Sequence, residues 1–112
     1  MLNVQNRGSA LLIMSNAKTS GFSFSVEPVT KGQTIDVGYV DDNGESRMVI
    51  LTVLAVKKYQ IDGSNGAIDV YSNISLEAEI LRHADSGYTE TAKKFNFTLE
   101  KDAQPFQFDT IV

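Results

Sequence analysis

The chain has 112 residues, which is enough for one domain with a core of its own. Its composition, 42% apolar and 21% charged with a net charge of −4, excludes low-complexity disorder and any overall positive field for nucleic acid or anionic lipid. The absence of cysteine excludes disulfides, thiolate metal sites and cysteine nucleophiles.

Residues 1–20 predict an N-terminal arm or two short strands, and residues 21–112 predict a β-domain. The apolar run at 10–14 is shorter than the apolar region of a secretory signal. We therefore expect no signal peptide, and no run is long enough to predict a transmembrane helix.

Alternating apolar and polar residues predict strands at 22–26 and 35–39. The second leads into Asn43-Gly44, and Asn-Gly is the strongest short hairpin signal because both residues tolerate positive φ. The turn predicts an antiparallel partner strand over residues 47–61.

The longest apolar run is MVILTVLAV, residues 48–56, and its β-branched side chains favour a strand over a buried helix. Successive side chains of a strand point to opposite faces, so Met48 and Ile50 face one side while Val49 and Leu51 face the other. Both sets are apolar. We therefore expect this strand to be covered on both faces.

Residues 74–83 fit two structures. They alternate as in a half-buried strand, whereas Ser75 as an N-cap, with Leu76 and Ile80 on one face, predicts a short helix. Further strands are predicted at 67–71, 88–99 and 106–112, with turns at 62–66 and 85–87. Together these segments predict an all-β, single-domain antiparallel β-sandwich or small β-barrel, with a helix near 75–84 as the alternative for that segment.

A Phe-x-Phe pattern places two rings on one side of a strand and occurs three times, at Phe22/Phe24, Phe95/Phe97 and Phe106/Phe108. The pattern predicts a shared aromatic core, and a platform for stacking bases is the alternative.

Signals for catalysis are weak. His83 is the only histidine, and the chain contains no nucleophile elbow, P-loop or dinucleotide-binding motif. Acidic residues occur in the turns near Asp41 and Asp62, but neither turn has EF-hand spacing, and turns favour Asp for backbone reasons. We predict a protein that is not an enzyme and has no metal or cofactor.

The most specific polar pattern is a pair of lysines followed by an aromatic residue, which occurs twice, at residues 57–59 and 93–95. Cations for phosphates and rings for bases are what a single-strand binder needs. A nucleic-acid site of OB-like type is therefore the alternative prediction, although paired lysines also protect strand edges from aggregation. Its residues would be Arg47, Lys57, Lys58, Tyr59, Lys93, Lys94 and Phe95.

Residues 1–14 (MLNVQNRGSALLIM) and 52–61 (TVLAVKKYQI) resemble the opening and third strand of the carbon-storage regulator family of RNA-binding proteins, over about a quarter of the chain. The resemblance implies RNA binding through arginines. The family's adjacent arginine pair is reduced here to Asn6-Arg7, and its second essential arginine falls at Ser72. Because those cations are missing, we do not assign the chain to the family.

The leading prediction is a structural or assembly protein, such as a small β-rich phage virion component (capsid decoration or tail protein). Apolar strand-like segments at 11–14 and 106–112 favour contacts with other copies or other assembly proteins, because such segments can extend a neighbour's sheet. Both segments can instead complete the domain's own sheets. If the protein is such a component, we expect to find it in the virion or the cytoplasm. We expect no membrane partner.

Overall fold

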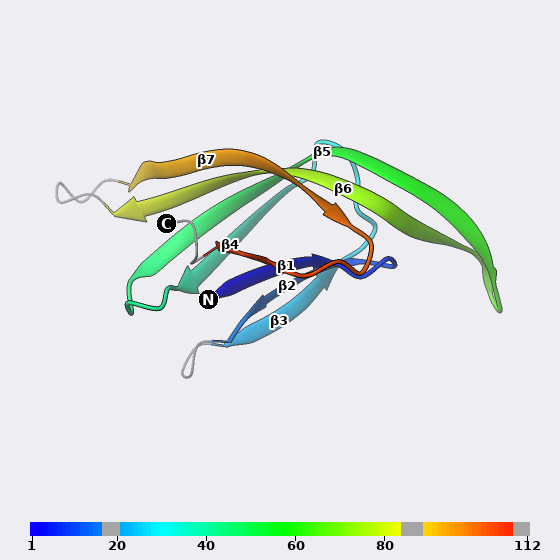
Figure 1. Cartoon of the computed structure of the whole chain (residues 1–112), viewed down its shortest axis with the longest axis horizontal. Helices are drawn as coiled ribbons and strands as arrows, with labels where there is room; N and C mark the ends of the chain where they lie inside the picture. Colours follow the sequence, from blue (N-terminus) through cyan, green and yellow to red (C-terminus); the bar gives the residue numbers. More distant parts are fainter. Residues whose placement is uncertain (17–20, 84–88, 109–112) are drawn as a thin grey trace.

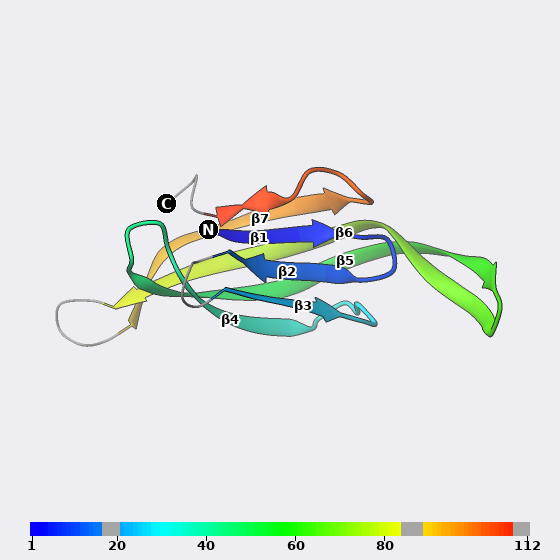
Figure 2. The same ribbon diagram turned by 90° about the horizontal axis from the view of Figure 1, so that it is seen from below.

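The computed structural model describes residues 1–16, 21–83 and 89–108, which form two antiparallel four-stranded sheets packed face to face (Figure 1, Figure 2). The short-strand sheet, in the order β3-β2-β1-β8, contains β1 (Leu2–Asn6), β2 (Leu11–Ser15), β3 (Phe22–Val26) and β8 (Phe106–Gln107). The long-strand sheet, in the order β4-β5-β6-β7, contains β4 (Thr34–Val40), β5 (Ser46–Gly63), β6 (Gly66–His83) and β7 (Thr89–Glu100). The predicted all-β antiparallel sandwich is confirmed.

The hairpin predicted from Asn43-Gly44 joins β4 to β5. Val37 lies opposite Val49, and the Asp41 N–H donates to the Glu45 carbonyl at 2.9 Å to close the turn. Gly44 has a φ of 81°, a conformation that costs glycine little because it lacks a Cβ.

Residues 74–83 are strand, not helix, and belong to β6. Their buried side chains alternate with half-buried ones, as a sheet with one covered face requires. The predicted turn at 85–87 and residues 109–112 of the last predicted strand lie outside the described residues.

The core lies between the two sheets. Its fully buried members include Leu2, Val4, Leu11 and Ile13 from the short-strand sheet and Val49, Leu51, Leu76 and Ile80 from the long-strand sheet. A cluster of four rings joins β7 to the β8 region, with contacting centroids 4.3 to 6.0 Å apart, and it contains Phe95, Phe97, Phe106 and Phe108. The predicted aromatic core is confirmed for these two pairs.

The expectation that residues 48–56 are covered on both faces is wrong. Val49 and Leu51 are buried between the sheets, whereas Met48 on the opposite face is 43% exposed and Ile50 is half-buried. A two-layer sandwich covers only the inner face of each sheet, and the described residues supply no third layer.

The N-terminal strands complete the protein's own sheet. β2 pairs with β1 on one side and β3 on the other, and β1 also pairs with β8, where Val4 lies opposite Phe106. The backbone groups of residues 11–15 are therefore already used within the molecule, which leaves β2 no free edge for a partner.

The molecule is elongated, with extents of 53 × 28 × 20 Å, because β5 and β6 run past the sandwich. Each has 18 residues, whereas strands of the facing sheet have five or fewer. In Figure 1 the two strands leave the sandwich together as a curved hairpin, drawn in green.

Candidate protein-binding arm

The projecting part of the β5–β6 hairpin, residues 58–71, is here called the arm. Tyr59 lies opposite Val70 and Ile61 opposite Ile68, and the two strands end at Gly63 and Gly66. Only two residues, 64 and 65, connect them, and Gly66 adopts a φ of 117° that a side chain would strain. The short turn fixes the register, and hence which side chains share a face.

One face of the arm is apolar. Tyr59, Ile61 and Ile68 share it, and their side chains are 45%, 47% and 44% exposed. Val70 lies on the same face at the base of the arm and is buried. The Tyr59 hydroxyl lies 3.3 Å from Lys101 Nζ, so this ring is also held at the base.

The Ile68 side chain packs closely against the backbone of Gly63 near the end of the arm. A Cβ added at Gly63 would lie 2.4 Å from Ile68 Cδ1 and 2.9 Å from the Gly66 carbonyl oxygen. A larger residue at this position would displace the isoleucine. The close approach of the Ile68 side chain and the Gly66 carbonyl to position 63 therefore requires glycine there.

The opposite face of the arm is polar. Lys58 and Gln60 donate to the two carboxylate oxygens of Asp69, at 3.3 and 3.0 Å. The hydrogen bond from Gln60, followed by that from Lys58, lowers the pKa of Asp69 below its usual value. The arm is thus a two-stranded hairpin with one polar and one apolar face.

The base of the arm is tied to the short-strand sheet. The Tyr71 hydroxyl accepts a hydrogen bond from the Val29 N–H at 2.9 Å, and the Tyr71 N–H donates to the Gly8 carbonyl at 2.8 Å. Asn6 is fully buried, and its Nδ2 donates to the carbonyls of Tyr71 (2.9 Å) and Leu99 (3.2 Å). These bonds hold the arm in a defined direction relative to the sandwich.

Arg47, from the predicted nucleic-acid site, is used inside the protein. Its guanidinium hydrogen-bonds and ion-pairs with Asp41, and both side chains are at least nine-tenths buried. Burial disfavours the charge on Asp41, but hydrogen bonds from Arg47 and from the N–H groups of Glu45 and Asn43 outweigh it. The pKa of Asp41 therefore lies below its usual value. The pair fixes the β4–β5 turn.

The two lysine pairs do not converge on one groove. Lys93 lies opposite Ile80, which lies opposite Val49, whereas Lys57 is eight residues further along β5, about 26 Å away at roughly 3.3 Å per residue. Lys58 and Lys94 lie 3.3 and 3.7 Å from the carboxylates of Asp69 and Glu77.

The aromatic members of the predicted site are also separated. Phe95 packs in the ring cluster between the sheets, and Tyr59 lies on the arm. The geometry therefore does not assemble the seven predicted residues into one surface.

Acidic side chains do not gather into a metal site in the described residues, where no three His, Asp or Glu side chains come together as ligands. Asp41 and Asp69 instead pair with Arg47 and Lys58. His83 is the last residue of β6.

Comparison of the chain with protein-family models, curated proteins and solved structures gave no match. Within the described residues no helix is long and apolar enough to span a bilayer. The function is therefore inferred from the arm and the sandwich themselves.

Ile61, Ile68 and Gly63 are not among the residues that the sequence predicted for a site. A signal for them exists, because the apolar residues are symmetric about positions 64 and 65. Tyr59 and Ile61 precede that turn at the same distances at which Val70 and Ile68 follow it. A mirrored apolar pattern predicts that both strands present these side chains on one face of a hairpin.

Proposed function

We propose that the protein is a non-enzymatic structural or assembly module that binds a protein partner through the apolar face of the arm. The supporting observation is that Tyr59, Ile61 and Ile68 gather, each nearly half exposed, on one face of a hairpin that projects from the sandwich. Contiguous exposed apolar side chains of this kind mark interaction surfaces. The rigid base, held by Asn6 and Tyr71, presents them without a large ordering cost on binding.

A small virion component, such as a capsid decoration or tail protein, is the setting we propose for this module. Such proteins act by repeated protein-protein contacts, which suits a projecting arm. This part of the proposal comes from the size and β-rich character of the chain and from its lack of a catalytic motif.

Site-specific photo-crosslinking in the cells that make the protein tests the proposal. A photoreactive residue at Ile61 should yield a covalent adduct with a protein partner. The same residue at Phe24, which is 39% exposed on the distant edge strand β3, should not. Equal yields at both positions, or no adduct at Ile61, would contradict binding through the arm.

The alternative, single-stranded nucleic-acid binding, predicts a salt-dependent rise in the fluorescence anisotropy of a labelled oligonucleotide. We expect no rise at low salt, because the lysine pairs are dispersed and Lys58, Lys94 and Arg47 lie beside carboxylates. Tight binding that Lys57→Glu abolishes would favour the alternative instead.

A further inference from the structure

The outer edge of β5 has no partner strand along the arm. β4 pairs with β5 as far as Thr34 opposite Thr52, and the turn before β4 adds two bonds at Val53, to Gly32 (2.8 Å) and Gln33 (2.9 Å). Past Val53 the described residues supply no strand on this side of β5. The arm is therefore a two-stranded ribbon, and such ribbons are marginally stable until further strands are added.

The backbone groups of alternate arm residues point outward from this edge. Hydrogen-bonded and non-hydrogen-bonded pairs alternate along an antiparallel ladder. The Tyr71 N–H donates to the Gly8 carbonyl, so Tyr71 and the opposite Lys58 form a non-hydrogen-bonded pair. No bulge interrupts positions 58 to 63. The N–H and C=O groups of Lys58, Gln60 and Asp62 therefore all point away from β6.

The same edge of a second copy is complementary to this one when the two strands run antiparallel and centre on Gln60. The outward-facing residues of the two strands can then exchange about six backbone hydrogen bonds. On the apolar face, Tyr59 of each copy lies opposite Ile61 of the other, because the two residues flank Gln60. Aromatic–aliphatic pairs directly opposite each other stabilise a ladder.

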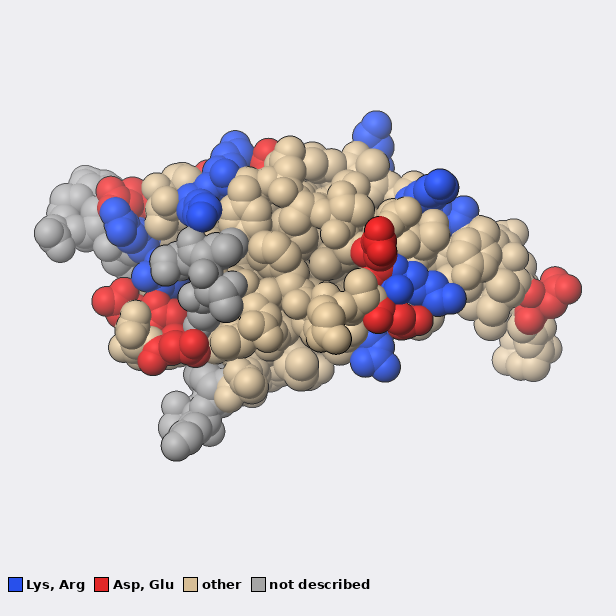
Figure 3. Space-filling view, in the orientation of Figure 1, with Lys and Arg blue, Asp and Glu red and all other residues tan. Residues whose placement is uncertain are grey.

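The charges of the two arms are also complementary in this arrangement. Lys58 of each copy lies opposite Asp62 of the other, and both side chains belong to the polar face. Figure 3 shows acidic atoms at the tip of the arm and basic atoms nearer the sandwich. Antiparallel arms therefore place each acidic tip beside the basic base of the other arm.

The existing contact of Lys58 leaves room for this pairing. Its Nζ lies 3.3 Å from Asp69 in an exposed ion pair, and Gln60 also donates to that carboxylate. An ammonium group has three donors, so Lys58 can bind Asp69 of its own copy and Asp62 of the other. Within the described part of the chain the Asp62 carboxylate has no ion pair of its own.

Shifted registers bring like charges together. A centre at residue 58 would set two lysines opposite each other, and a centre at residue 62 would set two aspartates opposite each other. Like charges directly opposite destabilise a ladder. The centre at Gln60 pairs both Lys58 and Asp62 with an opposite charge.

Lys58 also distinguishes a second copy from an unrelated strand. A lysine on an edge strand discourages pairing with other chains. A second copy carries Asp62 at the matching position, so the same lysine attracts it. The edge is therefore selective for its own sequence.

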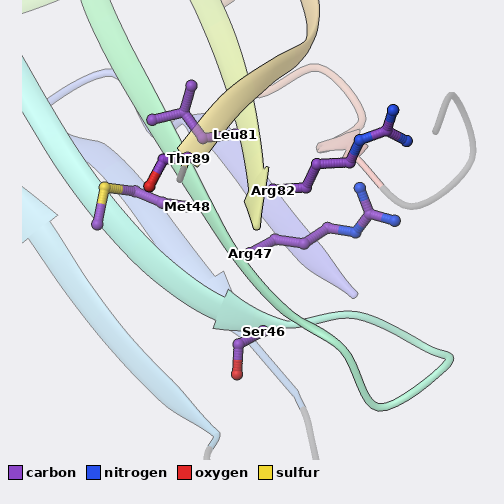
Figure 4. Close-up of a pocket in the computed structure, with 6 residues that line it drawn as sticks. All are labelled: Ser46, Arg47, Met48, Leu81, Arg82 and Thr89. Atoms are coloured by element: carbon purple, nitrogen blue, oxygen red, sulfur yellow. The ribbon is translucent and has the colours of Figure 1, made fainter. Parts of the chain in front are cut away.

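The hollow at the far end of the long-strand sheet is less suited to the arm. It has a volume of about 350 Å³, and Figure 4 shows Met48 and Leu81 on one side of the strands and the guanidinium groups of Arg47 and Arg82 on the other. Both arginines already form ion pairs within the molecule. The hollow therefore offers no unpaired charge to the acidic tip.

We infer that two copies of this chain join through the β5 edges of their arms, which pair antiparallel about Gln60 into one four-stranded sheet. The contact is symmetric, so it closes at two copies. It goes beyond the proposed function, because it uses the edge of the arm and leaves the apolar face open. The joined arms present Tyr59, Ile61 and Ile68 of both copies to a partner as one continuous surface.

The mass of the purified chain in solution is the first test. Light scattering during size-exclusion chromatography should show a mass that rises with concentration from one copy toward two and no further. Gln60→Pro should weaken dimerisation about tenfold or more, because proline cannot donate to the central pair. The matched control Asp69→Pro makes the same change at the opposite edge of the arm and should leave the mass unchanged. Equal effects of the two prolines would overturn the choice of edge.

A charge reversal tests the register. Lys58→Glu and Asp62→Lys should each lose dimerisation alone, because each variant places like charges opposite each other in its own pair. A mixture of the two variants should dimerise, since every acidic residue then lies opposite a lysine of the other copy. Compensation within one chain cannot explain this result. A mixture that stays monomeric would contradict the register.

Cysteine trapping locates the contact, because the natural chain has no thiol. A mixture of Tyr59→Cys and Ile61→Cys should form a disulfide-linked heterodimer. Tyr59→Cys with Ile68→Cys should not, although Ile68 lies on the same face, because β6 is on the far side of the arm. Linkage of Ile68→Cys to itself instead would overturn pairing through β5.

This inference and the proposed function can fail separately. At a photoreactive Ile61, an adduct of twice the chain's mass reports the joined arms, whereas an adduct with another protein reports the proposed function. A chain that stays monomeric at every concentration would overturn the dimer. An adduct with another protein would then still support binding through the apolar face.

Discussion

Asn6 is a polar side chain with no exposed surface, and its amide satisfies three backbone groups. In addition to the two carbonyls bound by Nδ2, Oδ1 accepts the Gly8 N–H at 2.9 Å. Because Tyr71 and Leu99 belong to the long-strand sheet, this one side chain links the two sheets. Buried polar groups of this kind contribute most through what their loss leaves unpaired.

Asn6→Ala should lower the free energy of unfolding by about 1–3 kcal/mol or more, the cost of leaving buried backbone groups without a partner. Urea denaturation followed by circular dichroism would measure the change. Gln5→Ala is the matched control, since Gln5 donates only to the exposed Ala103 carbonyl, and its effect should be small. A similar loss for both variants would mean that Asn6 is not a special link.

The Asp41–Arg47 pair predicts a pH dependence. Because the pKa of Asp41 in the folded protein lies below the ordinary value of 3.8, its ionised form stabilises the fold above that pH. This contribution to stability is lost as the pH falls through the lower pKa that Asp41 has in the folded protein. Asp41→Asn should therefore reduce stability at neutral pH by about 1–3 kcal/mol, the value of hydrogen bonds to a charged group.

Thermal unfolding of wild type and Asp41→Asn from pH 7 to pH 2 checks this expectation. The two melting temperatures should begin to converge as the pH falls below 3.8, and the difference due to the charge should vanish once the pH is below the lowered pKa of Asp41 in the folded protein. Asp42→Asn, which removes a carboxylate that is 61% exposed in the same turn, should shift melting much less. A difference that is constant with pH would show that charge is not the cause.

At the scale of the element, β5 has one buried and one uncovered face. Leu51→Ala should lower the free energy of unfolding by about 2–5 kcal/mol, because it leaves a cavity between the sheets. Ile50→Ala, on the outer face of the same strand, should lower the free energy of unfolding by much less, because the Ile50 side chain is only half-buried. Chemical denaturation of both variants measures the contrast, and equal losses would mean that the outer face is also covered.

The sequence predicted the β4–β5 hairpin and the strand alternation well, because turn chemistry and side-chain period are local properties. It did not predict the uncovered outer face of residues 48–56. Both faces of that run are apolar, and whether a third layer covers them depends on the whole fold.

The extent of the arm was missed for a different reason. Ser72-Asn73 appears as a polar break between two strands, but β6 passes through it. The strand pairing shifts register there, between Lys57 and Lys58, and the Ser72 hydroxyl bonds to the Lys57 carbonyl at 3.0 Å. A bulge absorbs the polar residues without ending the strand.

A second bulge, together with the distance between the lysine pairs, acts against the predicted nucleic-acid site. Simple alternation from Val53 would place Lys57 on the buried face, whereas the register shift between Val53 and Ala55 reverses the phase. The alternation of side chains along a strand predicts which face of the sheet a residue occupies only as far as the next bulge, because the extra residue of a bulge reverses the alternation. The partners of Arg47 and Lys94 were also beyond prediction, because cross-strand pairing depends on register.

At the scale of the whole molecule, the arm and the sandwich should be separable. Tyr59 and Val70 are paired, so replacing residues 60–69 with Asn-Gly should close a two-residue hairpin directly above the base. Melting should change little, because residues 60–69 contribute no buried side chain. Small-angle scattering should show a smaller radius of gyration. A large drop in melting temperature would show that the arm stabilises the fold.

The pairing of β1 with β8 has a consequence for the order in which the chain folds. The long-strand sheet consists of consecutive hairpins, whereas the ladder between Asn3 and Gln107 closes a loop of nearly the whole chain, and such closure is slow. During synthesis the long-strand sheet can therefore pair first, and Val4 keeps an open strand edge until residues 106–108 have been made. In that interval the nascent protein is most exposed to pairing with a neighbouring chain.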